Sequence, residues 1–171
     1  MKEQEFMARA IELATKGQLT VQPNPMVGCV IVKGKKIVGE GWHKAYGDHH
    51  AEIQAIRQCK RKFGAKKSAL LLKGSYLYVN LEPCSIFKNT PPCVEALIAH
   101  GIEKVFCGTL DPNPKINGKG IKLLKKAGIQ TSVGLLKKEC EELNRIFFVT
   151  QRKARPYIIL KAAQSLDGKI A

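Results

Sequence analysis

Three side chains with the chemistry of zinc ligands stand where secondary structure elements are expected to begin or end. His50 comes at the start of a predicted helix, Cys84 follows a predicted strand, and Cys93 begins another predicted helix. One imidazole and two thiolates bind Zn²⁺ well, and three protein ligands leave a fourth position for water. The positive ends of the two helices would also favour thiolate over thiol. The pattern predicts one catalytic Zn²⁺ per chain, with a structural zinc site or unligated thiols as alternatives.

A carboxylate two residues after the histidine suggests what the zinc would do. On a helix of about 3.6 residues per turn, Glu52 lies about 200° from His50, so it need not be a fourth ligand. It could instead approach the metal-bound water from the side and move its proton, as in zinc nucleobase deaminases. Those enzymes usually have two residues between the cysteines. Here eight residues separate Cys84 from Cys93, and the longer loop could contact a larger substrate.

The elements that must position these residues alternate between strands and helices. A hairpin is predicted first, and later strands are each followed by a helix, which favours an α/β sheet covered on both faces. We expect Asp48 to be the N-cap of the helix that carries Glu52. The predicted strands are 26–32, 37–42, 75–80, 105–109, 129–133 and 157–160, and the predicted helices are one around 6–14 that stops before Gly17, then 50–59, 93–100, 120–127 and 136–147.

Composition places the chain among ordinary globular proteins. It has 171 residues, of which 44% are hydrophobic and 25% charged, which argues against disorder and against collagen-like or disulfide-scaffold chains. The longest apolar run, 26–32, is too short to span a bilayer, and the first residues lack the apolar centre of a secretory signal. A cytoplasmic, reducing location is the expectation. There the six cysteines are unlikely to form disulfides, and four of them should pack as small hydrophobic residues: Cys29, Cys59, Cys107 and Cys140.

The net charge of +15 predicts an attraction for anions. Nucleic acid, a phosphorylated metabolite and an acidic partner surface all fit such a charge, as does a simple solvated surface. The lysines are dispersed along the chain, and aromatic residues make up only 6%. A surface on which bases stack is therefore poorly supported, and nucleic acid is not expected as the partner.

Several longer motifs resemble the deaminase half of the RibD family, the bifunctional pyrimidine deaminase/reductases of riboflavin biosynthesis. The matching segments are Pro-Asn-Pro-Met-Val-Gly at 23–28, His43, Gly-Asp-His-His-Ala-Glu at 47–52, Leu-Glu-Pro-Cys at 81–84, Thr-Pro-Pro-Cys at 90–93, Asp-Pro-Asn-Pro at 111–114, and in the tail Arg-Pro-Tyr at 155–157, Leu-Lys at 160–161 and Ser-Leu-Asp-Gly-Lys-Ile-Ala at 165–171. The resemblance implies a three-layer α/β/α cytidine deaminase-like fold with a mixed five-stranded sheet.

The resemblance also implies an activity. Members of the family remove the 2-amino group of 2,5-diamino-6-(5-phosphoribosylamino)pyrimidin-4(3H)-one by hydrolysis and release ammonia. The substrate would thus be a small phosphorylated pyrimidine. By position, the zinc ligands would be His50, Cys84 and Cys93, with Glu52 moving the proton. The substrate pocket would contain Asn24, His43, Asp111 and Asn113, although an asparagine beside proline can equally serve only to shape a turn.

The loop between the cysteines departs from the family pattern. The family usually reads Cys-Ser-His-x-Gly-Lys/Arg-Thr-Pro-Pro-Cys, whereas here Ile86 takes the histidine position, Lys88 the glycine position and Asn89 the basic position. Lys88 could replace the lost cation against the substrate phosphate, or could face solvent. The departure leaves two alternatives open: a zinc deaminase for another nucleobase, nucleoside or tRNA adenosine, and an inactive, zinc-stabilised basic binding module.

The tail predicts a second unit. Residues 1–148 are expected to form the deaminase domain, and 149–171 a linker with the first strand of a reductase domain. No NADPH site can be complete in this chain, so a separate reductase chain is one expectation. A single strand cannot bury itself, and pairing with the sheet edge of a neighbour would give a homo-oligomer.

Overall fold

The computed structural model describes residues 2–86 and 91–170, and it contains the predicted mixed sheet of five strands. The strand order is β2-β1-β3-β4-β5; β1 is antiparallel to both neighbours, and β3, β4 and β5 are parallel. The strands are β1 (Gly28–Lys33), β2 (Lys36–Trp42), β3 (Tyr76–Leu81), β4 (Lys104–Thr109) and β5 (Gln130–Val133). The helices are α1 (Glu3–Thr15), α2 (Ala51–Leu72), α3 (Cys93–Ala99), α4 (Lys119–Lys126), α5 (Lys137–Leu143) and α6 (Arg145–Lys153).

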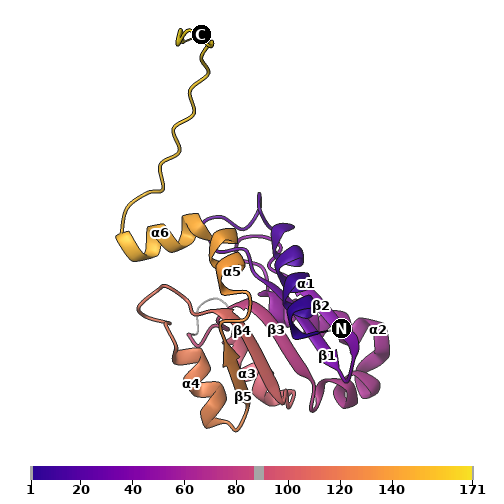
Figure 1. Ribbon diagram of the computed structural model, residues 1–171. Helices are drawn as coiled ribbons and strands as arrows, with labels where there is room; N and C mark the ends of the chain where they lie inside the picture. Colours follow the sequence, from indigo (N-terminus) through magenta and orange to yellow (C-terminus); the bar gives the residue numbers. More distant parts are fainter. Residues whose placement is uncertain (1, 87–90, 171) are drawn as a thin grey trace.

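Helices cover both faces of this sheet, which confirms the three-layer α/β/α architecture (Figure 1). Side chains alternate between the faces of a strand. In β1, Cys29 and Ile31 point to the layer of α2, α3 and α4, whereas Val30 and Val32 point to the layer of α1 and α5. All four cysteines predicted to be hydrophobic packing residues are buried and free of disulfides: Cys29, Cys59, Cys107 and Cys140.

Helix α2 is longer than the sequence predicted. It continues past Cys59 to Leu72, with a kink at Gly64, whose φ of 74° is left-handed. The lysine-rich stretch beyond Cys59 forms a solvated face, while Leu72 returns to the core. The predicted N-cap was also wrong. His50 occupies the N-cap position, and Asp48 instead accepts the backbone N–H of His49 at 2.7 Å.

The C-terminal part differs from the predicted elements in two ways. The helix expected over 136–147 is two helices, α5 and α6, with Asn144 between them. Helix α6 continues to Lys153, past position 148, where the domain boundary is expected. The strand predicted over 157–160 is absent from this described segment, which is extended and exposed (Figure 1). A strand needs a partner for its backbone groups, and none of the described strands pairs with this segment.

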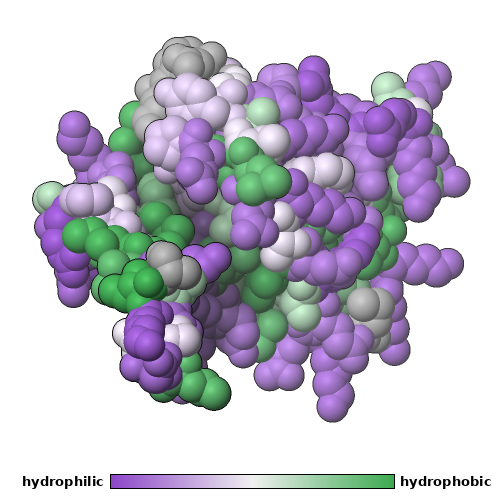
Figure 2. Space-filling view, turned by 90° about the horizontal axis from the view of Figure 1, so that it is seen from above, coloured by the Kyte–Doolittle hydropathy of each residue, from purple (hydrophilic) through white to green (hydrophobic). Residues whose placement is uncertain are grey.

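The face seen in Figure 2 is largely hydrophilic, with apolar side chains among the hydrophilic ones. Across residues 2–86 and 91–170, no helix has both the length and the apolar character that a membrane crossing requires.

Candidate active site

The three predicted zinc ligands converge, although they come from three separate segments. The Nδ1 atom of His50 lies 3.4 Å from Sγ of Cys84 and 3.3 Å from Sγ of Cys93. All three donor atoms lie within 4.8 Å of one another, and no other such cluster of His, Cys, Asp and Glu side chains occurs among the described residues.

Helix ends position these ligands. His50 is the N-cap residue of α2, and Cys93 is the first residue of α3, as the sequence predicted. Cys84 lies on the segment that leaves β3, and the backbone N–H of Cys93 donates to its sulfur at 3.2 Å. The positive ends of both helices therefore lie beside the sulfur atoms and stabilise negative charge there.

The donor set fits zinc. With Zn–N of about 2.0–2.1 Å and Zn–S of about 2.3 Å, tetrahedral nitrogen and sulfur ligands lie about 3.6 Å apart, close to the separations found here. The pKa of the Cys84 thiol is lowered to about 4, chiefly because the Cys93 side chain hydrogen-bonds to it, with His50 also contributing. The pKa of Cys93 is raised by the same shared bond. Cys84 is thus the thiol that ionises first, and His50, Cys84 and Cys93 form a zinc-binding site.

The Glu52 carboxyl lies beside this site but is not part of the three-ligand cluster. Its side chain is buried, with 2% of the residue exposed. Burial raises the pKa of Glu52, an effect partly opposed by the nearby His50 ring. A carboxyl group in such a place can accept a proton and return it.

A cavity of about 310 Å³ opens beside the zinc-binding site. It is lined by the predicted catalytic residue and by two of the zinc ligands, Glu52, His50 and Cys84. The predicted pocket residues Asn24, His43, Asp111 and Asn113 line the same cavity, although they come from three different loops. The structure therefore brings together every candidate site residue that it describes, with Cys93 reaching the site through the metal cluster rather than through the lining of the cavity.

The Asn24 and His43 side chains contact each other. Nδ2 of Asn24 lies 3.2 Å from Nε2 of His43, whose Nδ1 lies 3.3 Å from the carbonyl oxygen of His49. Burial lowers the pKa of His43, so its ring is neutral near pH 7 and can both donate and accept a hydrogen bond. The His43 and His50 rings meet edge to face, with centroids 5.5 Å apart.

The unusual loop is only partly described. Ile86, which takes the family's histidine position, lines the cavity. Lys88 and Asn89 lie outside the described residues, so the predicted phosphate contact of Lys88 stays a prediction.

Several lining residues had not been singled out from the sequence. Tyr46 comes from the loop after β2, and Phe147 and Gln151 come from α6. The sequence prediction missed the α6 pair, because the helix was expected to end at 147 and Gln151 therefore lay beyond it. Helical spacing of four residues between Phe147 and Gln151 would have been the usable sign.

Glu82 belongs to the Leu-Glu-Pro-Cys motif at 81–84, and the sequence assigns it no role of its own. In the structure it lines the cavity and holds the backbone of one wall in place. Its buried carboxylate accepts backbone N–H groups from Asp111 at 3.1 Å, Gly118 at 2.8 Å and Gly120 at 2.8 Å. These bonds fold the loop after β4 around the segment that carries Cys84.

Comparisons with known proteins agree with this geometry. Residues 1–109 match the family model described as the cytidine and deoxycytidylate deaminase zinc-binding region. The diaminohydroxyphosphoribosylamino-pyrimidine deaminase of Buchnera aphidicola from Schizaphis graminum is 49% identical over 156 residues, which covers 91% of this chain and 100% of that protein. The chain belongs to the RibD deaminase family.

Longer RibD proteins match over one part of their length. RibD of Bacillus amyloliquefaciens is 48% identical over 169 residues, or 99% of this chain and 43% of that protein. A Thermotoga maritima crystal structure, named as a deaminase and 5-amino-6-(5-phosphoribosylamino)uracil reductase, is 44% identical with a TM-score of 0.89 and covers 98% of this chain and 46% of that one. This chain thus spans less than half the length of these two relatives.

Proposed function

We propose that this chain is the deaminase that acts on 2,5-diamino-6-(5-phosphoribosylamino)pyrimidin-4(3H)-one in riboflavin biosynthesis. The observation that carries the proposal is the placement of a buried Glu52 at one cavity with two ligands of the zinc-binding site. The Buchnera deaminase, which this chain matches over that protein's whole length, supports the choice of substrate.

The reaction replaces the 2-amino group of the pyrimidine by oxygen. A bound zinc ion supplies Lewis acidity, which makes water acidic enough to act as a nucleophile near neutral pH. The Glu52 carboxylate takes a proton from the water that attacks C2 and delivers it to the departing nitrogen, and the second water proton ends on the adjacent ring nitrogen as the C2 oxygen becomes a carbonyl. The C2–N bond breaks, and ammonia leaves. His50, Cys84 and Cys93 hold the metal, and the burial of Glu52 keeps its proton from exchanging freely with solvent.

The other cavity residues would bind and orient the substrate. Asn24 and Asn113 offer amide donors and acceptors, Asp111 offers an acceptor, and the neutral His43 ring offers one of each. Such groups suit the polar ring and the ribose of a pyrimidine nucleotide. Lys88 is proposed as the phosphate contact on charge alone.

The segment after α6 would lead to the reductase that follows the deaminase in this family. Its apolar side chains at Ile158, Ile159 and Leu160 are 69–92% exposed, which suits a strand that pairs with a further domain or chain. We propose this role for 154–171 together with a deaminase unit that ends at α6.

The test is ammonia release by zinc-loaded protein. We expect turnover of the phosphorylated diaminopyrimidine, a loss of at least 1,000-fold in E52Q, and full activity in E103Q, a matched change at an exposed carboxylate. Zinc content should be the same in all three proteins. Ammonia from cytidine or from tRNA adenosine, but not from the diaminopyrimidine, would support another deaminase. If none of these substrates released ammonia, the result would support the alternative of an inactive, zinc-stabilised basic binding module.

A further inference from the structure

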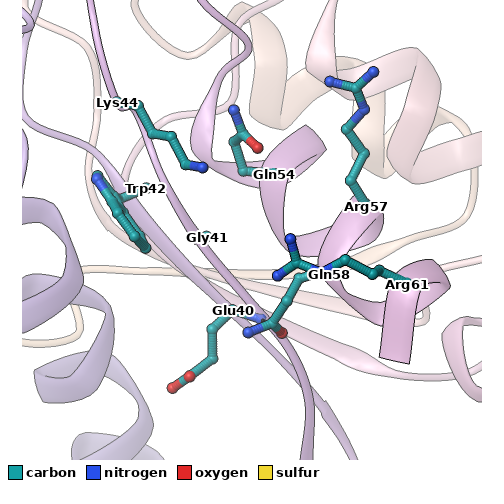
Figure 3. A pocket seen from close by; sticks show the side chains of 8 residues that line it. All are labelled: Glu40, Gly41, Trp42, Lys44, Gln54, Arg57, Gln58 and Arg61. Carbon is teal, nitrogen blue, oxygen red and sulfur yellow. Dashed lines mark hydrogen bonds between the residues drawn. The ribbon is translucent and has the colours of Figure 1, made fainter. Parts of the chain in front are cut away.

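A second cavity of about 310 Å³ lies beside the outer edge of β2, between this strand and α2 (Figure 3). None of its lining residues borders the candidate active-site cavity. Four of them come from one helix: Gln54, Arg57, Gln58 and Arg61. Their spacing of three, four and seven residues places all four on the same face of α2.

Glycines let this helical face reach the strand. A Cβ atom on Gly41 would lie 2.4 Å from the backbone nitrogen of Ala55 and 2.5 Å from the backbone oxygen of Ala51, so no larger residue fits. The helix backbone therefore packs directly against β2. Side chains on the flank of α2 then extend past the sheet edge, and the Gln58 Oε1 atom accepts the backbone N–H of Glu40 at 2.7 Å.

The charges around this cavity are unbalanced. Its one carboxylate, on Glu40, is held by Arg9 at 2.7 and 3.4 Å and turns away from the centre of the pocket (Figure 3). Three cations remain, on Lys44, Arg57 and Arg61. Within 2–86 and 91–170, no ion pair involves any of them.

An aromatic ring and an amide group also lie around these cations. The Lys44 ammonium lies over the Trp42 ring, 5.3 Å from its centroid, and Lys16 lies 5.0 Å from the same ring. The Gln54 amide donates to Asp48, a residue that does not line this cavity, at 3.4 Å. Arg57 and Arg61 lie one helical turn apart on α2, a spacing at which like charges are destabilising, and their side chains point in different directions from the helix (Figure 3).

We propose that this pocket binds a small phosphorylated molecule through Lys44, Arg57 and Arg61. Guanidinium groups form paired hydrogen bonds with phosphate oxygens, and Arg61 extends over the pocket (Figure 3). The amide NH₂ of Gln58 is a further donor, since its oxygen is already used. The volume is at the lower end of the range of about 300–1,000 Å³ for small-ligand sites. This inference does not depend on the proposed deaminase activity.

The chain contains its own reporter for this site, because Trp42 is its single tryptophan. Zinc-loaded protein is titrated with ribose 5-phosphate and, separately, with inorganic phosphate, at constant ionic strength. We expect a saturable change in tryptophan fluorescence with a Kd below about 1 mM, because an anion draws Lys44 away from the ring. A response to ribose 5-phosphate alone identifies a phosphoester ligand, and a response to both identifies the phosphate group as the part recognised.

Two double variants make the test specific. R57Q/R61Q should weaken binding at least tenfold and leave basal ammonia release unchanged. K125Q/K126Q removes the same number of exposed charges from α4 and should bind as the parent does. Thermal melts check that both fold. An unsaturable signal, or equal binding by R57Q/R61Q, would overturn the proposal. Tighter binding of a single-stranded RNA than of ribose 5-phosphate, compared at equal concentrations of phosphate groups, would also overturn the proposal. The pocket would then be part of a nucleic-acid-binding surface.

Discussion

The Asn144 side chain pairs with the backbone of Met26, 118 positions earlier in the chain. Its Oδ1 atom accepts the Met26 N–H at 2.8 Å, and its Nδ2 atom donates to the Met26 carbonyl oxygen at 2.8 Å. Both backbone groups lie just before β1, outside its backbone pairing with β2 and β3, and the Met26 carbonyl oxygen also accepts Nδ2 of Asn80 on β3 at 3.0 Å. The buried amide thus takes the place of a strand partner, and it fixes the loop of Asn24 to the junction of α5 and α6.

Removing this amide should weaken both the fold and substrate binding. We expect N144A to lower the free energy of unfolding by about 1–3 kcal/mol, because the Met26 N–H loses its acceptor in a partly buried place. The Asn24 loop should also loosen, which raises KM more than it lowers kcat. Urea unfolding and steady-state kinetics measure the two effects. N117A, at an exposed asparagine, is the control and should stay within about 0.5 kcal/mol of the parent. Equal stability of the two variants would contradict this interpretation.

Glu82 should be among the most sensitive carboxylates in the chain. In E82Q, one acceptor oxygen becomes an NH₂ group that faces backbone N–H donors such as that of Gly118 or Gly120. We expect a loss of about 2–4 kcal/mol of unfolding free energy and a lower kcat, because the loop that carries Asp111 no longer keeps its shape. Chemical denaturation of E82Q beside E103Q measures the difference. A change below about 0.5 kcal/mol would show that these hydrogen bonds do not hold the loop.

Zinc removal should abolish ammonia release and lower thermal stability. The three ligands join the start of α2, the end of β3 and the start of α3, so metal binding stabilises the folded chain by mass action. We expect the melting temperature to fall on chelation and to return, with the activity, after one equivalent of Zn²⁺. C84A should show the low melting temperature whether or not zinc is added. Full activity at a zinc content below one tenth of an equivalent would contradict the zinc assignment.

Asn24 should contribute to binding rather than to the chemical step. In N24A the cavity loses one amide that lies 3.2 Å from His43. A lost hydrogen bond of about 1–1.5 kcal/mol corresponds to a KM roughly tenfold higher, with kcat within about threefold. Kinetics with the diaminopyrimidine, again beside N117A, test this. A large fall in kcat with unchanged KM would move Asn24 from binding to catalysis.

Local patterns in the sequence were sufficient to predict an α/β sheet covered on both faces and the zinc ligands, whereas the mixed five-stranded form of the sheet came from the family resemblance. A continuous apolar run rich in β-branched residues marks β1, and proline before Cys93 marks the start of α3, because these signals depend on residues near in the chain. The ligands themselves were recognisable from residue type, since few side chains bind zinc. The Glu52 role and the Asn24 contact are predictions that E52Q and N24A test, and the other substrate contacts and the Lys88 contact stay predictions.

Only the tertiary structure decided which distant groups meet. The three loops of Asn24, His43 and Asp111 border one cavity, and α6 adds Phe147 and Gln151 to its wall. The partners of Glu82 and Asn144 are backbone groups, which every residue carries, so no residue type in the sequence identifies them. Helix α2 passes Cys59 because Leu72 finds a buried place, and the predicted strand at 157–160 does not form because a strand requires a neighbour. Residue chemistry determined what kind of site this chain can build, and packing between distant segments determined its shape.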